Sequence, residues 1–245
     1  MLSKLTITMQ REDGMNLNAG SLMQGILMEK ISPDYAAELH QGSVNPYSQA
    51  LRFNENHIHW TISTLNEEAE RNILRPLLEN TDSSIVVKHK ELDLKILKKE
   101  LITISYEQLM DETYFGQCSP YLEIHFDSPT AFKVDGAYQF YPTVPHIFQS
   151  LIRKYDAFSN EEPIFSEELM KDISQNVYLS KYHLKSTLFY LEKTRIPSFR
   201  GTLTFRIQGP QLFRNLLHML AAFGEYSGVG IKTAMGMGAI RRVLK

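Results

Sequence analysis

The order of strand and helix signals occurs twice along this chain of 245 residues, and this repetition limits the fold more than any other feature. In each half the signals read strand, helix, two strands, helix, strand. Such an order forms a four-stranded sheet with two helices on one face. We therefore expect an α+β protein with two tandem ferredoxin-like (RRM-like) βαββαβ domains. Gly, Ser and Pro cluster near residues 116–120, which predicts domains at 1–117 and 118–245.

In the first half, the clearest local signal opens a short helix. Ser32 is a good N-cap and Pro33 suits the first helical position, so a helix is expected through about Gln41. Gly42 stands where a glycine would stop it. A later helix contains Pro76, which warns of an early end. Strands are expected at 5–9, 57–62, 84–87 and 92–104, with further helices over 21–31 and 67–78.

In the second half, alternation and helical spacing give an equally clear order of elements. Asp135 and Gly136 mark the turn of a hairpin. An amphipathic helix follows, and a second strongly apolar helix precedes the glycine-rich end of the chain. The strand regions are 121–126, 132–140, 177–196, 201–208 and 239–244, and the helices are 144–158, 161–174 and 210–223.

Composition excludes several classes of protein. Hydrophobic residues make up 43% of the chain, as in globular proteins. No apolar run approaches the ~20 residues of a membrane span, and the N-terminal residues lack the apolar core of a secretory signal. We therefore expect a cytoplasmic protein with no membrane partner. With Cys118 as the one cysteine, a disulfide framework within the chain is excluded.

Charge is distributed unevenly. The net charge is −2, but residues 1–118 hold 11 Lys and Arg against 17 Asp and Glu, a net of −6. Residues 119–245 hold 15 against 11, a net of +4. Within them, 179–245 hold 11 basic residues against two acidic ones, a net of +9. This density is typical of a surface that binds a polyanion, and a solvated basic face explains it equally well.

The segment 224–238, GEYSGVGIKTAMGMG, holds five of the 13 glycines. Glycines allow close backbone approach and positive φ, which can build an anion-binding loop, and Lys232 and Thr233 add a charge and a hydroxyl. The order helix, loop, strand differs from that of a Walker loop or a dinucleotide fingerprint. A phosphate-contacting loop and a plain helix-to-strand connection are equally good interpretations.

This ending resembles the signature of CRISPR-associated repeat-RNA endoribonucleases of the Cas-six type, in the RAMP superfamily. Segments 128–142 and 196–209 agree with it, so three motifs in the expected order span most of 119–245. In the first half, the resemblance rests on an entry helix, residues 35–40 and the segment 45–48. The chain length and these segments look most like the versions of type III systems.

The resemblance implies cleavage of CRISPR precursor RNA within its repeats to give crRNA, without metal or cofactor. The ribose 2′-OH would attack, leaving a 2′,3′-cyclic phosphate and a 5′-OH. The catalytic histidine would be His40, since an imidazole can act as acid or base near neutral pH. Tyr47 is a candidate helper and equally a turn residue. Some relatives use a Tyr-His-Lys set; here Arg52 is the nearest basic residue after His40, so Arg52 or Lys232 would stabilise the transition state.

For RNA binding, the candidates come from the glycine-rich segment 224–238 and from the basic residues between 195 and 206. Glycine N–H groups and cationic side chains are suited to phosphates, and such contacts weaken as salt rises. The candidate residues are Gly228, Gly230, Lys232, Thr233, Gly236, Gly238, Arg195, Arg200 and Arg206.

Two other functions stay open: a non-catalytic RNA-binding subunit of a CRISPR effector complex, and a phosphate or nucleotide enzyme that uses the glycine loop. Repeat RNA or crRNA is the expected partner. Transient association with an effector complex and homodimer formation are left open. His57 and His59 share a strand face, but neither a cysteine nor a third histidine lies near them in sequence, so no metal site is expected.

Overall fold

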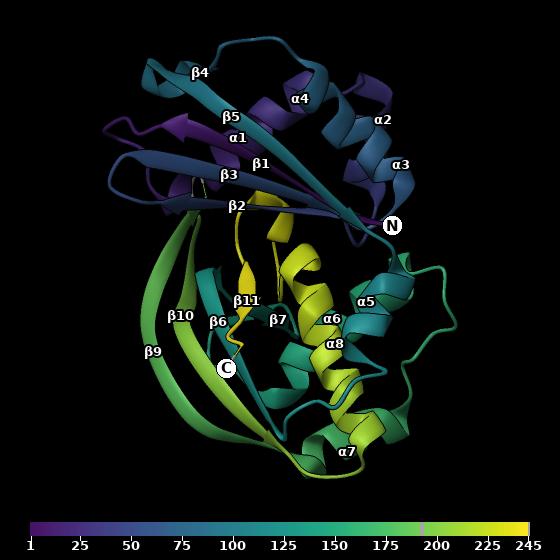
Figure 1. Cartoon of the computed structure of the whole chain (residues 1–245). Coiled ribbons are helices and arrows are strands. Elements are labelled where there is room, and N and C mark those ends of the chain that lie inside the picture. Colours follow the sequence, from purple (N-terminus) through teal and green to yellow (C-terminus); the bar gives the residue numbers. More distant parts are fainter. Residues whose placement is uncertain (192–193, 245) are drawn as a thin grey trace.

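The structure is a computed structural model that describes residues 1–191 and 194–244. It contains two α+β domains stacked one above the other (Figure 1). Residues 192–193, which the expected strand region 177–196 includes, lie outside the described residues, as does Lys245.

The first domain contains a ferredoxin-like sheet with one added strand; the sequence predicts four of its five strands and does not predict the strand at 47–53. The sheet order is β2-β3-β1-β5-β4, in which β4 forms an additional hairpin with β5. Helices cover the face away from the second domain (Figure 1). The strands are β1 (Leu2–Gln10), β2 (Tyr47–Phe53), β3 (His57–Thr64), β4 (Ser84–Val87) and β5 (Leu92–Ile104). The helices and 3-10 turns are η1 (Leu17–Ala19), α1 (Gly20–Lys30), α2 (Pro33–Gln41), α3 (Glu67–Ala69), α4 (Arg75–Glu79) and η3 (Lys88–Lys90).

The second domain has the strand order of a ferredoxin-like fold without additions. Its main sheet runs β11-β6-β10-β9, and β7 and β8 form a separate hairpin. Asp135 and Gly136 both have positive φ at the hairpin turn, as the sequence predicts. The strands are β6 (Tyr121–Thr130), β7 (Phe132–Val134), β8 (Ala137–Gln139), β9 (Val177–Leu191), β10 (Thr194–Ile207) and β11 (Ile240–Arg242). The helices are α6 (Val144–Phe158), α7 (Glu167–Asn176), α8 (Gln211–Ser227) and the 3-10 turn η4 (Thr233–Met235).

Pro76 changes the helix that was expected over 67–78. The segment contains a π turn, η2 (Glu70–Leu74), between α3 and α4. Proline lacks an N–H and collides with the carbonyl four residues before it, and a π turn is one way to accommodate this. Gly42 also differs from expectation: its φ is −68°, so α2 ends without a left-handed residue.

A helix that the sequence reading did not predict, α5 (Tyr106–Thr113), joins the two domains. Ser105 and Gln108 form a capping box at its start, a signal that was present in the sequence. Tyr106 and Leu109 pack in the core of the second domain. Packing therefore favours a division near Ser105, before α5, rather than between residues 117 and 118.

The junction between the domains is built around Gln49 on β2. Its amide donates to the backbone oxygens of Ala234 (2.7 Å) and Gly20 (3.1 Å), and its Oε1 accepts from the indole of Trp60 (2.6 Å). Gln49 and Trp60 are both buried, and buried polar groups without partners are costly. Ser48 adds a hydrogen bond to the backbone oxygen of Tyr226 at the end of α8.

We expect the Gly20→Ala substitution to disrupt this junction. A Cβ at Gly20 would lie 2.2 Å from the backbone oxygen of Met235, so the backbone must shift. Overpacking of this kind costs about 1–3 kcal/mol of unfolding free energy. Gly25 lies in the same helix with nothing within 4 Å of a Cβ, so Gly25→Ala serves as the control and should stabilise by about 0.5–1 kcal/mol. Urea unfolding measures both; equal effects at the two positions would contradict the account.

Candidate functional site

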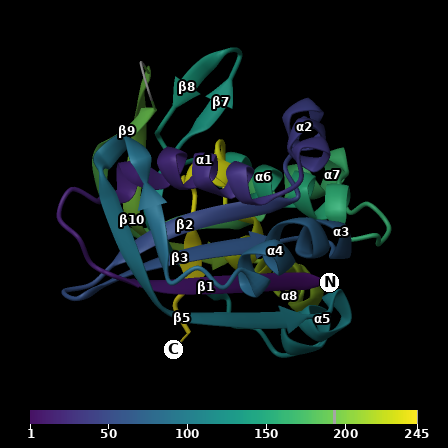
Figure 2. The same ribbon diagram turned by 90° about the horizontal axis from the view of Figure 1, so that it is seen from above.

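A groove of about 830 Å³ lies where the two domains meet. One wall is the loop after α2, residues 43–45; another is the glycine-rich segment at 230–234. The β7–β8 hairpin (132–135) and α6 (146–156) complete it. Figure 2 shows α2, α6 and this hairpin on the same side of the molecule. The groove is large enough for a nucleotide-sized ligand.

His40 lies at the C-terminal end of α2, directly before the loop that lines the groove. The side chain of Ser32 caps the start of α2, with Pro33 in its first turn, as the sequence predicts. Tyr35 and Leu39 face the core, so His40 is left on the exposed side. In the part of the chain that the structure describes, no hydrogen bond holds the imidazole. It is therefore free to meet a ligand.

The glycine N–H groups are not free to bind phosphate, contrary to expectation. Gly228 donates to Gly224 O, and Gly230 donates to Ser150 Oγ. Gly236 donates to Thr233 O, and Gly238 donates to Pro129 O. Their contribution is instead close backbone packing. A Cβ at Gly230 would lie 2.3 Å from Ala131 O, and one at Gly238 would lie 2.0 Å from Val229 O. The glycines thus let the backbone of the segment pack directly against the backbone of Ala131 and Val229.

Lys232 is the charged candidate of this segment. It lines the groove and has a positive φ of 54°, which is uncommon for a non-glycine residue. Thr233, by contrast, is buried, and its hydroxyl accepts from the ammonium of Lys154 at 3.2 Å. Thr233 therefore serves an internal hydrogen bond, and Lys232 is the better candidate for binding a ligand.

Basic side chains outnumber acidic ones along the groove. Lys133, Arg153, Lys154 and Lys232 line it beside two aspartates, Asp135 and Asp156. The carboxylate of Asp156 is occupied, since it accepts the N–H groups of Ile164 (2.9 Å) and Phe165 (3.1 Å). The groove therefore favours an anionic ligand.

The sequence reading missed the groove residues Lys133, Arg153 and Lys154. A signal existed for Lys154, which stands seven residues after Ile147 and thus on the apolar face of α6. A charged residue at such a position requires buried partners. Burial lowers the pKa of Lys154 to about 7.

Tyr47 does not reach the groove. Its ring is 1% exposed, and its hydroxyl accepts a hydrogen bond from Gln24 at 3.3 Å. Burial raises the pKa of this hydroxyl, while the contact with Gln24 partly opposes the shift. A phenol in this position serves the core of the first domain rather than a phosphate. Tyr47 is also not the turn residue of the alternative interpretation, since it is the first residue of β2 and packs in the core.

Arg52 is not brought to His40 either. It lies five residues beyond Tyr47 on β2, about 17 Å along the strand. There its guanidinium pairs with Asp127 of β6 at 2.9 Å, and Arg241 reaches the same carboxylate at 3.3 Å. Arg52 thus ties the two domains together at the far end of the strand. Among the two cations expected for the transition state, the geometry favours Lys232.

The three candidate arginines of β10 lie away from the groove. Phe199, Leu203 and Phe205 face the core, so Arg200 and Arg206 point to the face of the sheet without helices. Arg200 stands opposite Lys185, and burial lowers its pKa while Asp127 opposes the shift. Arg195 lies over the ring of Tyr190. A ligand that touches both Lys232 and these arginines must extend around the second domain.

The described residues offer no group of three or more His, Cys, Asp or Glu that could hold a metal ion. His57 and His59 share a face of β3, as expected, and His59 is within hydrogen-bond distance of Thr8 (3.1 Å) and Asn54 (3.3 Å). Among the same residues, no helix is long and apolar enough to cross a membrane.

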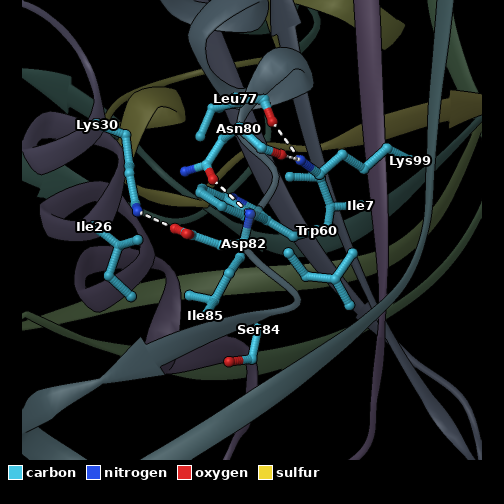
Figure 3. Close-up of a pocket in the computed structure, with 11 residues that line it drawn as sticks. Ile7, Ile26, Lys30, Trp60, Leu77, Asn80, Asp82, Ser84, Ile85 and Lys99 are labelled. Carbon is cyan, nitrogen blue, oxygen red and sulfur yellow. Dashed lines mark hydrogen bonds and ion pairs between the residues drawn. The ribbon is translucent and has the colours of Figure 1, made fainter.

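A smaller hollow inside the first domain is not a ligand site. Its volume is about 20 Å³, room for a single water molecule. Figure 3 shows Lys99 directed at backbone oxygens at the end of α4, and Lys30 paired with Asp82 at 2.7 Å. These side chains close the edge of the core.

Comparison with known proteins identifies the family. A family model described as CRISPR-associated endoribonuclease Cas6 matches residues 124–240. A protein of that name from Streptococcus thermophilus is 32% identical over 240 residues, which cover 98% of both chains. This chain belongs to the Cas6 family. A Cas6 protein of Mycobacterium tuberculosis (strain CDC 1551 / Oshkosh) is 35% identical over 246 residues, covering 98% of this chain and 78% of its own.

Solved Cas6 structures share the fold over the whole chain. A Cas6 product complex aligns with a TM-score of 0.82 at 20% identity, covering all of both chains. Thermus thermophilus Cas6 aligns with a TM-score of 0.76 at 21% identity, covering 99% of this chain and 98% of its own. A RAMP protein that binds different RNA substrates aligns at 0.64 and 14%, covering 99% and 100%. The two tandem ferredoxin-like domains predicted from the sequence are thereby confirmed.

Proposed function

We propose that this Cas6 family member is an endoribonuclease that cuts CRISPR precursor RNA within its repeats to give crRNA. The observation that carries the proposal is the make-up of the groove. His40 lies in the last turn of α2, shortly before the loop 43–45 that lines the groove, and Lys232 is part of the same lining. An imidazole that can transfer a proton thus lies next to a basic groove that is suited to the RNA backbone.

The proposed reaction is metal-independent and needs no cofactor. The ribose 2′-oxygen forms a bond to the scissile phosphorus as the bond to the 5′-oxygen breaks, which leaves a 2′,3′-cyclic phosphate and a 5′-OH. His40 takes the proton from the 2′-OH or gives one to the leaving 5′-oxygen, since a histidine can serve either role near neutral pH. Lys232 stabilises the charge that develops on the phosphate oxygens.

The RNA follows the basic surfaces in this proposal. Groove side chains, Lys133, Arg153 and Lys232, contact phosphates near the cleavage position. Arg195, Arg200 and Arg206, which do not line the groove, contact a more distant part of the RNA. Support comes from proteins of similar fold: a Cas6 product complex, a RAMP protein that binds different RNA substrates, and a partial Cas6-RT-Cas1–Cas2 complex.

Substituting His40 tests the catalytic assignment. We expect His40→Ala to reduce the single-turnover cleavage rate at least about 100-fold, because proton transfer contributes about 10²–10⁴ to such rates. Binding of the same RNA should stay within about threefold, since His40 lies beyond the basic lining of the groove. A filter-binding assay and a gel assay on one repeat RNA measure both quantities.

The control for this test is His59→Ala, which removes an imidazole from the first domain away from the groove. It should cut at the wild-type rate. A His40→Ala variant that also cuts at the wild-type rate would exclude the assignment. A wild-type chain that binds repeat RNA but never cuts it would instead favour the non-catalytic subunit.

Substituting Lys232 tests the phosphate contact. We expect Lys232→Ala to weaken RNA binding and to reduce the slope of log K against log salt by about one, because one fewer counterion is released. Lys171→Ala removes an exposed lysine of α7 outside the groove lining and should leave the slope unchanged. An unchanged slope for Lys232→Ala would remove this residue from the phosphate contacts.

A further inference from the structure

Helix α6 holds the glycine-rich segment through two polar side chains, four residues apart on one face of the helix. The hydroxyl of Ser150 accepts the N–H of Gly230 at 2.8 Å. The ammonium of Lys154 donates to the backbone oxygens of Ser227 (3.0 Å) and Gly228 (2.9 Å) and to the hydroxyl of Thr233 (3.2 Å). These contacts fix both ends and the middle of the loop 228–233.

We propose that Lys154 is a positioning residue for RNA binding: its ammonium joins the two ends of the loop 228–233 and so sets the place of Lys232. The inference rests on the proposed function and deepens it. Lys154 is 7% exposed and lies behind the loop, so it acts on RNA through Lys232 rather than by contact.

The three acceptors explain why a lysine stands here. Ser227 is the last residue of α8 and Gly228 its C-cap, so their carbonyls lie at the partly negative C-terminal end of a helix of 17 residues, where the hydroxyl of Ser227 also donates to Gly228 O. An ammonium has three donors, one for each acceptor. An apolar side chain of similar length would leave all three oxygens without this donor.

The unusual backbone conformation of Lys232 explains why the loop needs the hydrogen bonds from Lys154. A non-glycine residue with φ of 54° is held in a sparsely populated region, which persists only where its surroundings fix it. Lys232 is followed directly by Thr233, whose hydroxyl Lys154 holds. Loss of that contact frees the residue next to Lys232, so the backbone of Lys232 in the groove lining is held less firmly.

The charge of Lys154 is balanced by these oxygens rather than by a carboxylate. The charged and titratable groups that line the same groove are Asp156 and Arg153 on α6, Lys133 and Asp135 on the hairpin, His146 at the start of α6, and Lys232. None of these shifts the pKa of Lys154, which burial alone lowers to about 7. The ammonium is therefore present below neutral pH and lost above it.

Loss of the proton affects RNA binding and stability in opposite directions. A neutral amine donates two hydrogen bonds and repels one of the three acceptors, so the loop loosens and affinity falls above pH 7. The pKa in the folded chain lies below that of an unfolded lysine, so unfolded chains bind more protons between about pH 7 and 10. The Lys154 contribution to the free energy of unfolding therefore rises over that range. If Lys154 only affected the stability of the fold, RNA affinity would not fall as the pH rises.

The test measures the affinity of wild type, Lys154→Met and Lys154→Arg for one RNA at pH 6 and pH 9. The probe is a repeat RNA from the CRISPR array of the host genome, with a 2′-deoxynucleotide at the position that the wild type cuts. We expect wild-type affinity to fall about tenfold between the two pH values. At pH 6, Lys154→Met should bind the RNA about tenfold more weakly than the wild type. At pH 9 its affinity should differ little from that of the wild type. Lys154→Arg stays charged at both values and should lose the pH dependence while keeping most of the affinity.

Lys171→Met is the control, because it removes one exposed positive charge from the same domain. It should behave as the wild type. Wild-type affinity and pH dependence in Lys154→Met would overturn the inference alone, and so would wild-type pH dependence in Lys154→Arg. A wild-type chain that neither binds nor cuts repeat RNA would overturn the proposed function and this inference with it.

Discussion

A close backbone contact that leaves no room for a side chain holds the two domains of this protein in place: η4 of the second domain touches the start of α1 at Gly20. Within the second domain, the segment 228–238 approaches the backbone of Ala131 at Gly230 and that of Val229 at Gly238. At each of these three positions a Cβ would lie within 2.3 Å of a backbone oxygen. Gln49 adds hydrogen bonds to both Gly20 and Ala234, so the same place is fixed by shape and by polar pairing.

The candidate site depends on this junction because neither domain contains the whole groove. The first domain supplies His40 and the loop 43–45, and the second supplies the glycine-rich segment, the hairpin and α6. A shift of one domain against the other would change the place of His40 relative to Lys232. The pair of Arg52 and Asp127, at the far end of β2, opposes the same shift. Arg52 therefore connects the two domains through this ion pair and is not a candidate for contact with RNA.

Local signals in the sequence were reliable where one short stretch determined the structure. The helix 144–158 and the turn at Asp135 and Gly136 were predicted with their observed positions, since spacing and turn chemistry suffice there. The π turn before Pro76 and the helix α5 were not predicted, although a proline and a capping box marked them locally. The packing of α5 in the second domain depends on residues distant in the chain. The glycines show the same limit: their freedom was visible, but whether it served a ligand or a backbone contact depended on Ala131 and Val229.

The site was predicted in part for the same reason. The position of His40 at the exposed end of α2 follows from Ser32 and Pro33, and the structure agrees. Burial of Tyr47 in the first-domain core and the contacts of Lys154 with Ser227, Gly228 and Thr233 arise only from the tertiary packing within each domain. The charge pattern pointed to the basic second half, yet its residues divide between the groove and the helix-free face of the sheet.

Cleavage of repeat RNA in the presence of EDTA tests the central claim most directly. The unmodified RNA is compared with a copy that carries a 2′-deoxynucleotide at the scissile position. The account predicts that EDTA leaves the rate unchanged, that only the unmodified RNA is cut, and that the upstream product ends in a 2′,3′-cyclic phosphate. Cleavage that stops in EDTA, or cleavage of the 2′-deoxy copy at the same position, would contradict it.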